Sequence, residues 1–266
     1  MSVVGSGRRA AGQPAAWRTT ARAERLAGLL RDAERAVVLT GAGVSVPSGI
    51  PDFRTPRTGL WENVNPMEVA HIDAWRRDPD SFWEFYADRF ASLVDKRPND
   101  AHLALAELER RGLIRGVITQ NIDRLHRVAG TKRLIEMHGS IEHSVCLDCG
   151  GKVALERVID QLRAHDGAPE CACCFTPLKP DVVLFGELLP ERALSEAQAL
   201  ALDADLMVCV GSSLEVYPVA GLPAITRGAG GRIALVTQGP TPYDHDAEVK
   251  LDGDVVEELR AVLAAL

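Results

Sequence analysis

The sequence predicts an α/β protein built on a doubly wound parallel sheet, with a small second module inserted into it. Short apolar runs alternate with helix-like segments along most of the chain, as they do where crossover helices join parallel strands. Two CxxC pairs, Cys146/Cys149 and Cys171/Cys174, interrupt this alternation and mark the insert. The 266 residues and 46% hydrophobic content fit one large domain with a smaller insert better than two equal halves.

Composition narrows the class of partner. The formal charge of −7 and a pI near 5.5 argue against a basic surface for a polyanion, so we expect no nucleic-acid partner. No apolar run approaches the roughly 20 residues that cross a bilayer, and the start lacks the apolar core of a secretory signal. We expect a soluble, cytoplasmic protein without a membrane partner. The oligomeric state stays open.

The N-terminal segment differs from the rest of the chain. Its first 23 residues hold four arginines and no acidic residue, which superficially resembles an organelle transit peptide. An Ala/Gly/Arg-rich flexible leader over residues 1–20 is the simpler interpretation. We therefore expect the folded domain to cover residues 21–266.

The predicted elements follow in order. Leu26, Leu29 and Leu30 at helical spacing predict a helix before the apolar strand Ala36–Leu39. Further apolar runs predict parallel strands, and the segments between them predict helices. The strands are Gly116–Thr119, Asp181–Phe185, Leu206–Val210 and Arg232–Val236, and the helices are His102–Arg111, Glu191–Leu202, Val219–Arg227 and Asp254–Leu266.

The inserted module is expected over about residues 140–180. Four thiolates in two CxxC pairs suit a closed, structural zinc site of the ribbon type, and the segment between them, Lys152–His165, has a helical pattern of its own. Two alternatives stay open. The thiols could form a redox dithiol, and Cys173 lies close enough in sequence to replace Cys174.

A glycine-rich turn leaves the first strand. In Gly41-Ala42-Gly43-Val44-Ser45 the backbone N–H groups can approach a pyrophosphate, but Val46 stands where the third glycine of the usual fingerprint belongs. The residues from Val46 to Arg54 predict a structured loop, whose tip Asp52-Phe53-Arg54 can close over a ligand. The alternative is a plain surface turn.

Polar residues follow two other predicted strands. Gln120, Asn121 and Asp123 come after Gly116–Thr119, and Gly211-Ser212-Ser213 comes after Leu206–Val210, at the sheet edge where open α/β folds place ligands. Asn121 and Asp123 could instead cap the next helix. His138 stands in a predicted turn and can exchange a proton near neutrality, although a single histidine is more often surface or core filler.

These segments together resemble the sirtuin family. The resemblance rests on six motifs in the family's order and covers the chain from about Leu26 to the C-terminus. They are GAGVSVPSGIPDFR (residues 41–54), TQNID (119–123), HG (138–139), the CxxC pairs, FGE (185–187) and GSS (211–213). It implies a Rossmann-like NAD-binding domain, NAD as co-substrate, one structural zinc and acyl-lysine proteins as substrates. Family spacing to Lys179-Pro180 favours Cys174 as the fourth zinc ligand.

The resemblance also implies residue roles. His138 is the catalytic base, and Asn121 and Asp123 place the nicotinamide and an ordered water. Two sets of contacts are implied besides. The dinucleotide contacts are Gly41, Ala42, Gly43, Ser45, Asp52, Phe53, Arg54, Gln120, Asn121, Ile122, Asp123, Gly211, Ser212, Ser213, Thr237, Gln238 and Asp254; the substrate contacts are Phe185, Gly186, Glu187 and Val216. Thr237-Gln238 departs from the family, which usually has an asparagine at the adenine ribose.

The implied activity is NAD-dependent removal of acyl groups from protein lysines, which yields nicotinamide and O-acyl-ADP-ribose. Acetyl is the first expectation. Tyr86 and Arg89 lie three apart on a predicted helix and resemble the pair in sirtuins that remove succinyl and malonyl groups, although Asp52 replaces the threonine usual there. An exposed helix face is the plain alternative for this pair. The competing functions are a non-catalytic NAD or ADP-ribose sensor and, last, a zinc-ribbon nucleic-acid binder.

Overall fold

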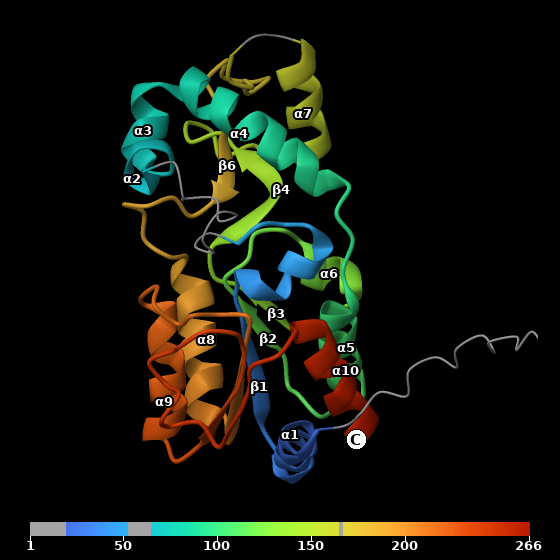
Figure 1. Ribbon diagram of the computed structural model, residues 1–266. Coiled ribbons are helices and arrows are strands. Elements are labelled where there is room, and N and C mark those ends of the chain that lie inside the picture. Colours follow the sequence, from blue (N-terminus) through green and yellow to red (C-terminus); the bar gives the residue numbers. More distant parts are fainter. Residues whose placement is uncertain (1–19, 53–64, 165–166) are drawn as a thin grey trace, which may run out of the picture.

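Two β-sheets organise the protein. The computed structural model describes residues 20–52, 65–164 and 167–266. The six-stranded sheet forms the lower lobe of Figure 1, and a three-stranded sheet lies in the upper lobe. The strands of the large sheet, in spatial order, are β3 (Leu134–Glu136), β2 (Val117–Thr119), β1 (Ala36–Thr40), β7 (Leu206–Val210), β8 (Arg232–Val236) and β9 (Val249–Leu251).

The large sheet is parallel throughout, and its order reverses beside β1. From β1 the chain first builds outward through β2 to β3, then returns to the other side of β1 and builds outward through β7, β8 and β9. Thr40 pairs with Thr119 on one side and with Val210 on the other. Such a reversal opens a crevice at the carboxyl ends of the strands, where doubly wound folds bind their ligands.

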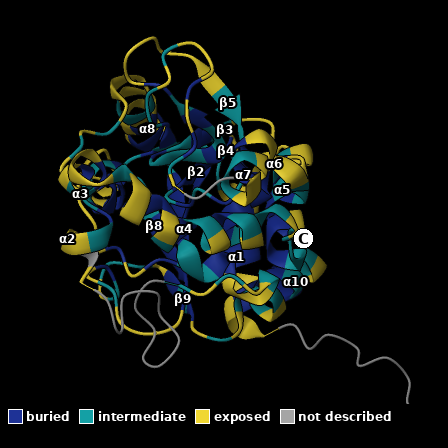
Figure 2. Ribbon diagram, turned by 90° about the horizontal axis from the view of Figure 1, so that it is seen from above, coloured by how far each residue is buried: buried dark blue, intermediate teal, exposed yellow. Residues whose placement is uncertain are grey.

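Helices cover both faces of this sheet. Alternate residues of each strand enter different cores: Val38 and Val208 pack toward one face, Leu39 and Cys209 toward the other. The first face is covered by α1 (Ala21–Asp32), α5 (Asp100–Arg110) and α10 (Val255–Ala265), and the second by α8 (Glu191–Asp203) and α9 (Leu222–Gly228). The strands are continuous apolar runs because both of their faces are buried. The buried segments lie between helices whose outer sides are exposed (Figure 2).

The upper lobe is built around the small antiparallel sheet. Its strands are β5 (Lys152–Ala154), β4 (Gly139–Val145) and β6 (Lys179–Val182), in that spatial order. The helices α2 (Pro66–Val69), α3 (Ile72–Arg77), α4 (Pro79–Val94) and α7 (Leu155–Ala164) surround it. The indole nitrogens of Trp75 and Trp83 both donate to the backbone oxygen of Leu178, at 3.3 and 2.8 Å, which ties α3 and α4 to the segment that enters β6.

Most predicted elements are confirmed, and one is wrong. The predicted parallel strand Asp181–Phe185 is β6, which ends at Val182 and pairs antiparallel with β4 in the small sheet. A short apolar run carries no signal for strand direction or for the sheet it joins, so the error arose there. The predicted helix Val219–Arg227 begins with a 3₁₀ turn (Val219–Gly221) before α9. We did not predict β3, β4, β5 or β9.

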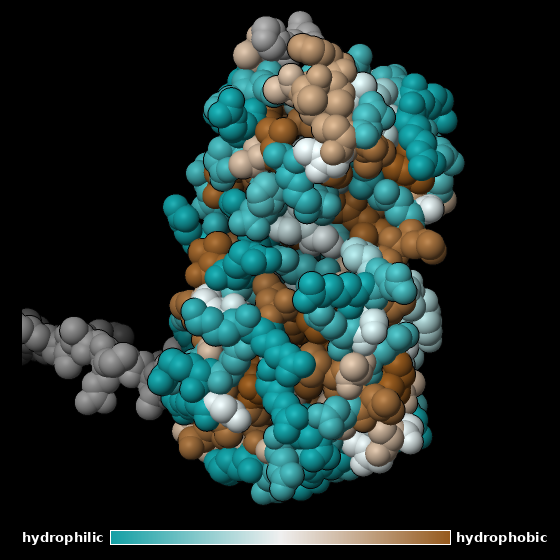
Figure 3. Space-filling model, turned by 180° about the vertical axis from the view of Figure 1, so that it is seen from behind, coloured by the Kyte–Doolittle hydropathy of each residue, from teal (hydrophilic) through white to brown (hydrophobic). Residues whose placement is uncertain are grey.

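The face opposite to the view of Figure 1 mixes polar and apolar side chains. Seen from behind, brown apolar side chains are interspersed with teal polar ones over both lobes (Figure 3). Within the described ranges no helix is long and apolar enough to cross a membrane. The leader predicted over residues 1–20 lies, except for Thr20, outside the described residues.

Candidate functional site

Two glycine loops meet where the order of the large sheet reverses. After β1 the chain forms a 3₁₀ turn, Ala42–Val44, and the N–H of Gly43 donates to the oxygen of Gly211 at 2.8 Å. A Cβ on Gly41 would lie 2.8 Å from the Cβ of Ser212, and one on Gly43 would lie 2.9 Å from the Cα of Gly211. Both glycines are therefore required for the packing of the two loops, whatever ligand binds beside them.

A buried polar cluster lies next to these loops. The amide nitrogen of Asn121 donates to the backbone oxygen of Gly41 and to the hydroxyl of Ser45, both at 3.1 Å. Ser45 donates to the Oδ2 of Asp123 at 2.6 Å, and Gln120 donates to Ser212 at 2.9 Å. The predicted residues after β1, β2 and β7 are thus joined by hydrogen bonds. Ile122 adjoins the apolar core of the upper lobe.

Asp123 combines the two alternatives that the sequence left open. Its Oδ1 accepts the N–H of Leu125, the first residue of α6 (Leu125–Ala129), at 2.9 Å, although the N-cap position itself is Arg124. Its Oδ2 accepts from Ser45 inside the polar cluster. Burial raises the pKa of the Asp123 carboxyl, and the hydrogen bonds from Ser45 and Leu125 oppose that rise. A bond to the first N–H of the helix and membership of the polar cluster are therefore compatible.

His138 lies in the turn between β3 and β4, as predicted. Its Nδ1 is 2.8 Å from the backbone oxygen of Gln120. Because a carbonyl oxygen only accepts, Nδ1 carries the proton and the neutral ring keeps the lone pair on Nε2. Burial lowers the pKa of His138, while the bond to Gln120 opposes that shift, so the ring is neutral at pH 7. Nε2 has no hydrogen-bond partner within the described chain, which suits a general base.

Two further histidines reach this region, and sequence reasoning missed both. His102 in α5 and His126 in α6 are fully or almost fully buried, and their rings meet edge to face with centroids 4.8 Å apart. His102 Nε2 lies 3.3 Å from Ser45 Oγ, and His126 Nε2 lies 2.9 Å from Thr40 Oγ1. The available signal was a histidine at His102 on the same helix face as Leu105, where an apolar residue is expected.

The loop after Ser45 is described only as far as Asp52. A 3₁₀ turn, Val46–Ser48, ends at Gly49 with φ of 74°, so this part is a structured loop and not a regular helix, as predicted. Asn99, the N-cap of α5, donates to the oxygen of Val44 and to the hydroxyl of Ser48, each at 2.9 Å. The predicted loop tip continues with Phe53 and Arg54, which lie outside the described residues.

The FGE segment lies alongside α3. The backbone of Phe185 exchanges hydrogen bonds with Ala70 and Ile72, both at 2.9 Å, and the space for a Cβ on Gly186 is occupied by the ring of His71. The carboxylate of Glu187 turns inward, 2.9 Å from the Nζ of buried Lys179 and 2.9 Å from the N–H of Leu184.

Four large side chains in or next to the predicted substrate segments are exposed. They are Phe185, Leu188, Val216 and Tyr217. Val216 therefore stays accessible to a substrate, whereas the carboxylate of Glu187 is already paired within the chain.

Tyr86 and Arg89 do lie on one helix, α4, but in different surroundings. Tyr86 is 7% exposed and packs between the rings of Phe82 and Phe90, so the exposed-face alternative is wrong for Tyr86. Burial raises the pKa of Tyr86 to about 12, so its hydroxyl keeps its proton. The guanidinium of Arg89 lies 3.7 Å from the centroid of the Phe85 ring and donates to the Phe85 oxygen.

Three of the predicted dinucleotide contacts, Thr237, Gln238 and Asp254, lie between β8 and α10. Gln238 donates to the oxygen of Gly253 at 3.3 Å, and the hydroxyl of Thr237 donates to the oxygen of Gln238 at 3.4 Å. Asp254 is the N-cap of α10 and accepts the N–H groups of Val256 and Glu257. The structure thus gives all three residues contacts within the protein, and their ligand contacts stay a prediction.

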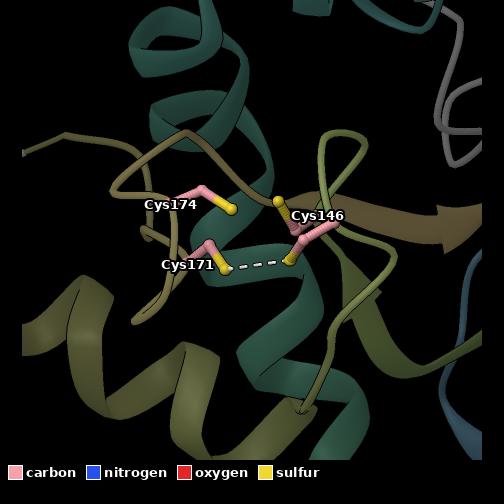
Figure 4. A group of neighbouring side chains, drawn as sticks. Cys146, Cys171 and Cys174 are labelled. Carbon is pink, nitrogen blue, oxygen red and sulfur yellow. Dashed lines mark hydrogen bonds between the residues drawn. The ribbon is translucent and has the colours of Figure 1, made fainter.

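Four thiols converge in the upper lobe, and Figure 4 labels three of them, Cys146, Cys171 and Cys174. The sulfurs of Cys146, Cys149, Cys171 and Cys174 all lie within 4.8 Å of one another, and Cys149 and Cys171 are 3.7 Å apart. A tetrahedral zinc with bonds of about 2.3 Å separates its sulfurs by roughly 3.8 Å, so the four residues fit this ion. Cys174 belongs to the cluster, whereas Cys173 lies outside it and is exposed. Four thiolates close the coordination sphere, so such a zinc is structural.

Fold and site together define a class of protein. An open parallel sheet with glycine loops and a polar crevice at its reversal point, joined to a four-thiolate module, describes a dinucleotide-binding α/β protein with a structural metal site. The chain belongs to the Sir2 family, because the model of that family matches residues 41–218. The sirtuin resemblance in the sequence is thereby confirmed.

Individual relatives agree with this assignment. The chain is 46% identical to an NAD-dependent protein deacetylase of Thermotoga maritima, with 88% of this chain and 94% of the relative covered. A solved structure of a Sir2 variant with a deacetylated p53 peptide and 3'-O-acetyl ADP-ribose superposes with a TM-score of 0.87 at 44% identity, covering 91% of this chain and 98% of that one. Another, of Sir2 with p53 peptide and NAD⁺, gives 0.83 at 45% identity, covering 90% and 96%.

Proposed function

We propose that this protein removes acyl groups from protein lysine side chains with NAD as co-substrate, releasing nicotinamide and O-acyl-ADP-ribose. The observation that carries the proposal is the neutral His138, whose Nδ1–H is held by Gln120 and whose Nε2 lone pair faces no partner in the described chain. His138 lies on the same sheet edge as the buried pair Asn121 and Asp123. A sensor that only binds nucleotide has no need of a base beside such a pocket.

NAD extends along the carboxyl edge of the large sheet in this proposal. The loops Gly41–Ser45 and Gly211–Ser213 hold the pyrophosphate and a ribose, and Thr237, Gln238 and Asp254 lie toward the adenine end. Asn121, Ile122 and Asp123 receive the nicotinamide. Asn121 donates to the oxygen of Gly41, and Gln120 donates to Ser212, so the loops after β1 and β7 are both tied to this segment. The predicted contacts of the loop tip, Asp52 to Arg54, fall outside the described residues from Phe53 onward. The meeting of two close-packed loops at the reversal point of the sheet supports this placement.

The proposed reaction uses the base in its second half. The carbonyl oxygen of the acyl-lysine attacks the ribose C1′ of NAD, the bond to nicotinamide breaks, and an alkylamidate forms. Nε2 of His138 then takes the proton of a ribose hydroxyl, whose oxygen attacks the amidate carbon. Water completes the release of lysine and O-acyl-ADP-ribose. The protein orients both substrates and shields the cation-like ribose carbon from water.

The remaining parts have supporting roles. Residues 21–266 act as one catalytic domain, in which Cys146, Cys149, Cys171 and Cys174 hold a structural zinc within the module of about residues 140–180. Phe185, Gly186, Glu187 and Val216 border the substrate peptide, with Glu187 acting through its bond to Lys179. Thiolate ligation needs a reducing compartment, which supports the cytoplasm.

Acetyl is the leading acyl group, since the relative from Thermotoga maritima carries the name deacetylase. Succinyl and malonyl are the second candidates. They are favoured by a protonated Tyr86 and a guanidinium at Arg89 on the same helix, because both can donate to a carboxylate.

The test is direct. Purified protein mixed with NAD and an acetylated peptide should release nicotinamide, deacetylate the peptide and form O-acetyl-ADP-ribose in equal amounts. Succinylated and malonylated peptides of the same sequence complete the panel. Tight NAD binding without turnover of any of these peptides would favour the sensor and overturn the proposal.

A further inference from the structure

Three polar groups surround the hydroxyl of Ser45. They are the Nε2 of His102 at 3.3 Å, the amide nitrogen of Asn121 at 3.1 Å and the Oδ2 of Asp123 at 2.6 Å. A serine hydroxyl has one hydrogen to give and two lone pairs that accept. The one hydrogen and both lone pairs of the Ser45 hydroxyl are therefore engaged.

The direction of each bond follows from the chemistry of the partners. The amide nitrogen of Asn121 can only donate, and 2.6 Å is the length of a hydrogen bond from a hydroxyl to a carboxylate. Ser45 thus gives its one hydrogen to Asp123. The remaining partner, Nε2 of His102, faces a lone pair of Ser45 and must itself carry a hydrogen.

The surroundings of His102 agree with this assignment. Its side chain is fully buried, and its Nδ1 has no hydrogen-bond partner. Burial lowers the pKa of His102 to about 4, so the ring is neutral at pH 7 and has one N–H. A hydrogen on Nδ1 would be a buried donor without an acceptor, which costs more than a bare lone pair. The edge-to-face ring of His126 keeps the imidazole in this orientation.

We propose that His102 is a positioning residue of the active site: its Nε2–H holds the Ser45 hydroxyl, and Ser45 in turn holds the carboxylate of Asp123. The proposal rests on the deacylase function proposed above. His102 does not itself line the proposed nicotinamide pocket, because Ser45 lies between them. It therefore acts only through Ser45. Since Leu125 already fixes Oδ1 of Asp123, the bond from Ser45 to Oδ2 locks the plane of the carboxylate.

A double-mutant cycle tests the proposal in the full chain. We expect His102→Leu to lower kcat about three- to tenfold and to weaken nicotinamide inhibition by a similar factor, with the KM for the acylated peptide unchanged. His102→Gln should recover most of this loss, because its amide nitrogen can donate from the same place. Added to Ser45→Ala, His102→Leu should cause little further loss.

Thr226→Val is the matched control, because Thr226 is equally buried, donates to the oxygen of Ala201 and has no hydrogen bond to Ser45 or His102. Its effect should add to that of Ser45→Ala. Thermal unfolding of each variant corrects for the folded fraction. Equal losses in His102→Leu and His102→Gln, or full additivity of His102→Leu with Ser45→Ala, would overturn the proposal.

A second measurement needs no variant. Nitrogen-15 spectra of the histidine rings in the unmodified protein at pH 7 should show His102 neutral with its hydrogen on Nε2. A hydrogen on Nδ1, or a charged ring, would overturn the positioning role. This readout is independent of turnover. If the unmodified protein fails to deacylate any peptide, the proposed function fails, and the spectra still decide the hydrogen-bond arrangement around Ser45.

Discussion

The Nδ1 of His138 lies 2.8 Å from the backbone oxygen of Gln120. Gln120 follows β2 directly and precedes Asn121 and Asp123, so the segment that carries the polar pair also fixes the tautomer of the histidine. One stretch of backbone thereby positions both the proposed base and the residues of the proposed nicotinamide pocket.

Replacement of His138 by alanine should remove the proposed base. We expect kcat to fall by a factor of about 10² to 10⁴, because general base catalysis contributes this much. The assay is nicotinamide release in the presence of an acylated peptide, with circular dichroism as the check on folding. His245→Ala, at an exposed histidine, is the matched control and should keep its activity. Unaltered turnover by His138→Ala would refute the assigned role.

On the acid side of the pH–activity profile, activity should fall only at a pH below the ordinary histidine pKa. The pKa of His138 is lowered by burial from its ordinary value of 6.5, and the base acts in its neutral form. Activity should therefore persist below pH 6.5 and decline only as the pH falls through the lowered pKa. The measurement is kcat/KM for the acylated peptide between pH 5 and 8. An acid limb centred at or above 6.5 contradicts the expected environment of His138.

Folding stability should decrease on mild acidification. Burial lowers the pKa of His102 to about 4 and that of His126 to about 3, whereas both titrate near 6.5 in the unfolded chain. The unfolded state therefore binds more protons between these values, so the stability present at pH 7 is lost as the pH falls below 6.5. Between pH 7 and pH 5, each of the two histidines should lower the free energy of unfolding by about 2 kcal/mol.

Urea unfolding at pH 7, 6 and 5 measures this loss. His102→Gln has no titrating ring at this position, so its stability should depend less on pH than that of the unmodified protein. The same pH dependence in both proteins would exclude His102 as a source of the effect.

The thiol cluster distinguishes two neighbouring cysteines. Cys174→Ser removes one of the four clustered sulfurs, and Cys173→Ser changes an exposed thiol outside the cluster. We expect Cys174→Ser to lose bound zinc and to melt at least about 4 °C lower, which is roughly 1–2 kcal/mol in a domain of this size. Cys173→Ser should keep both values. Metal analysis and thermal unfolding check this, and zinc loss in Cys173→Ser alone would reverse the ligand assignment.

Acyl preference should depend on Arg89 if the protein takes acidic acyl groups. Arg89→Met removes the guanidinium that lies over Phe85, and we expect kcat/KM for a succinyl peptide to fall about tenfold or more relative to an acetyl peptide. Arg76→Met, at an exposed arginine of α3, controls for the loss of charge. A ratio that does not move shows that Arg89 is not the selector, and acetyl then remains the expected substrate.

Local patterns in the sequence predicted what depends on neighbours in the chain. The strands β1, β7 and β8 follow from continuous apolar runs, because both of their faces are buried. The helices α1, α5, α8 and α10 follow from apolar periodicity, because one face of each is buried. His138 in a turn and the polar residues after β2 follow from the order of elements. The pairing of β6 could not be predicted, because strand direction depends on partners far away in the sequence.

By itself, the sequence determined the class of fold, the sheet edge that carries the polar residues, and the family, since each of these depends on residue types at short or fixed spacing. Only the tertiary structure decided which atoms meet. It showed that Gly41 and Gly43 are needed to pack against Gly211 and Ser212, and that His102 reaches Ser45 across 57 positions of sequence. Hydrogen bonds and close contacts depend on distances of a few ångströms, and those are set by the packing of helices on the sheet.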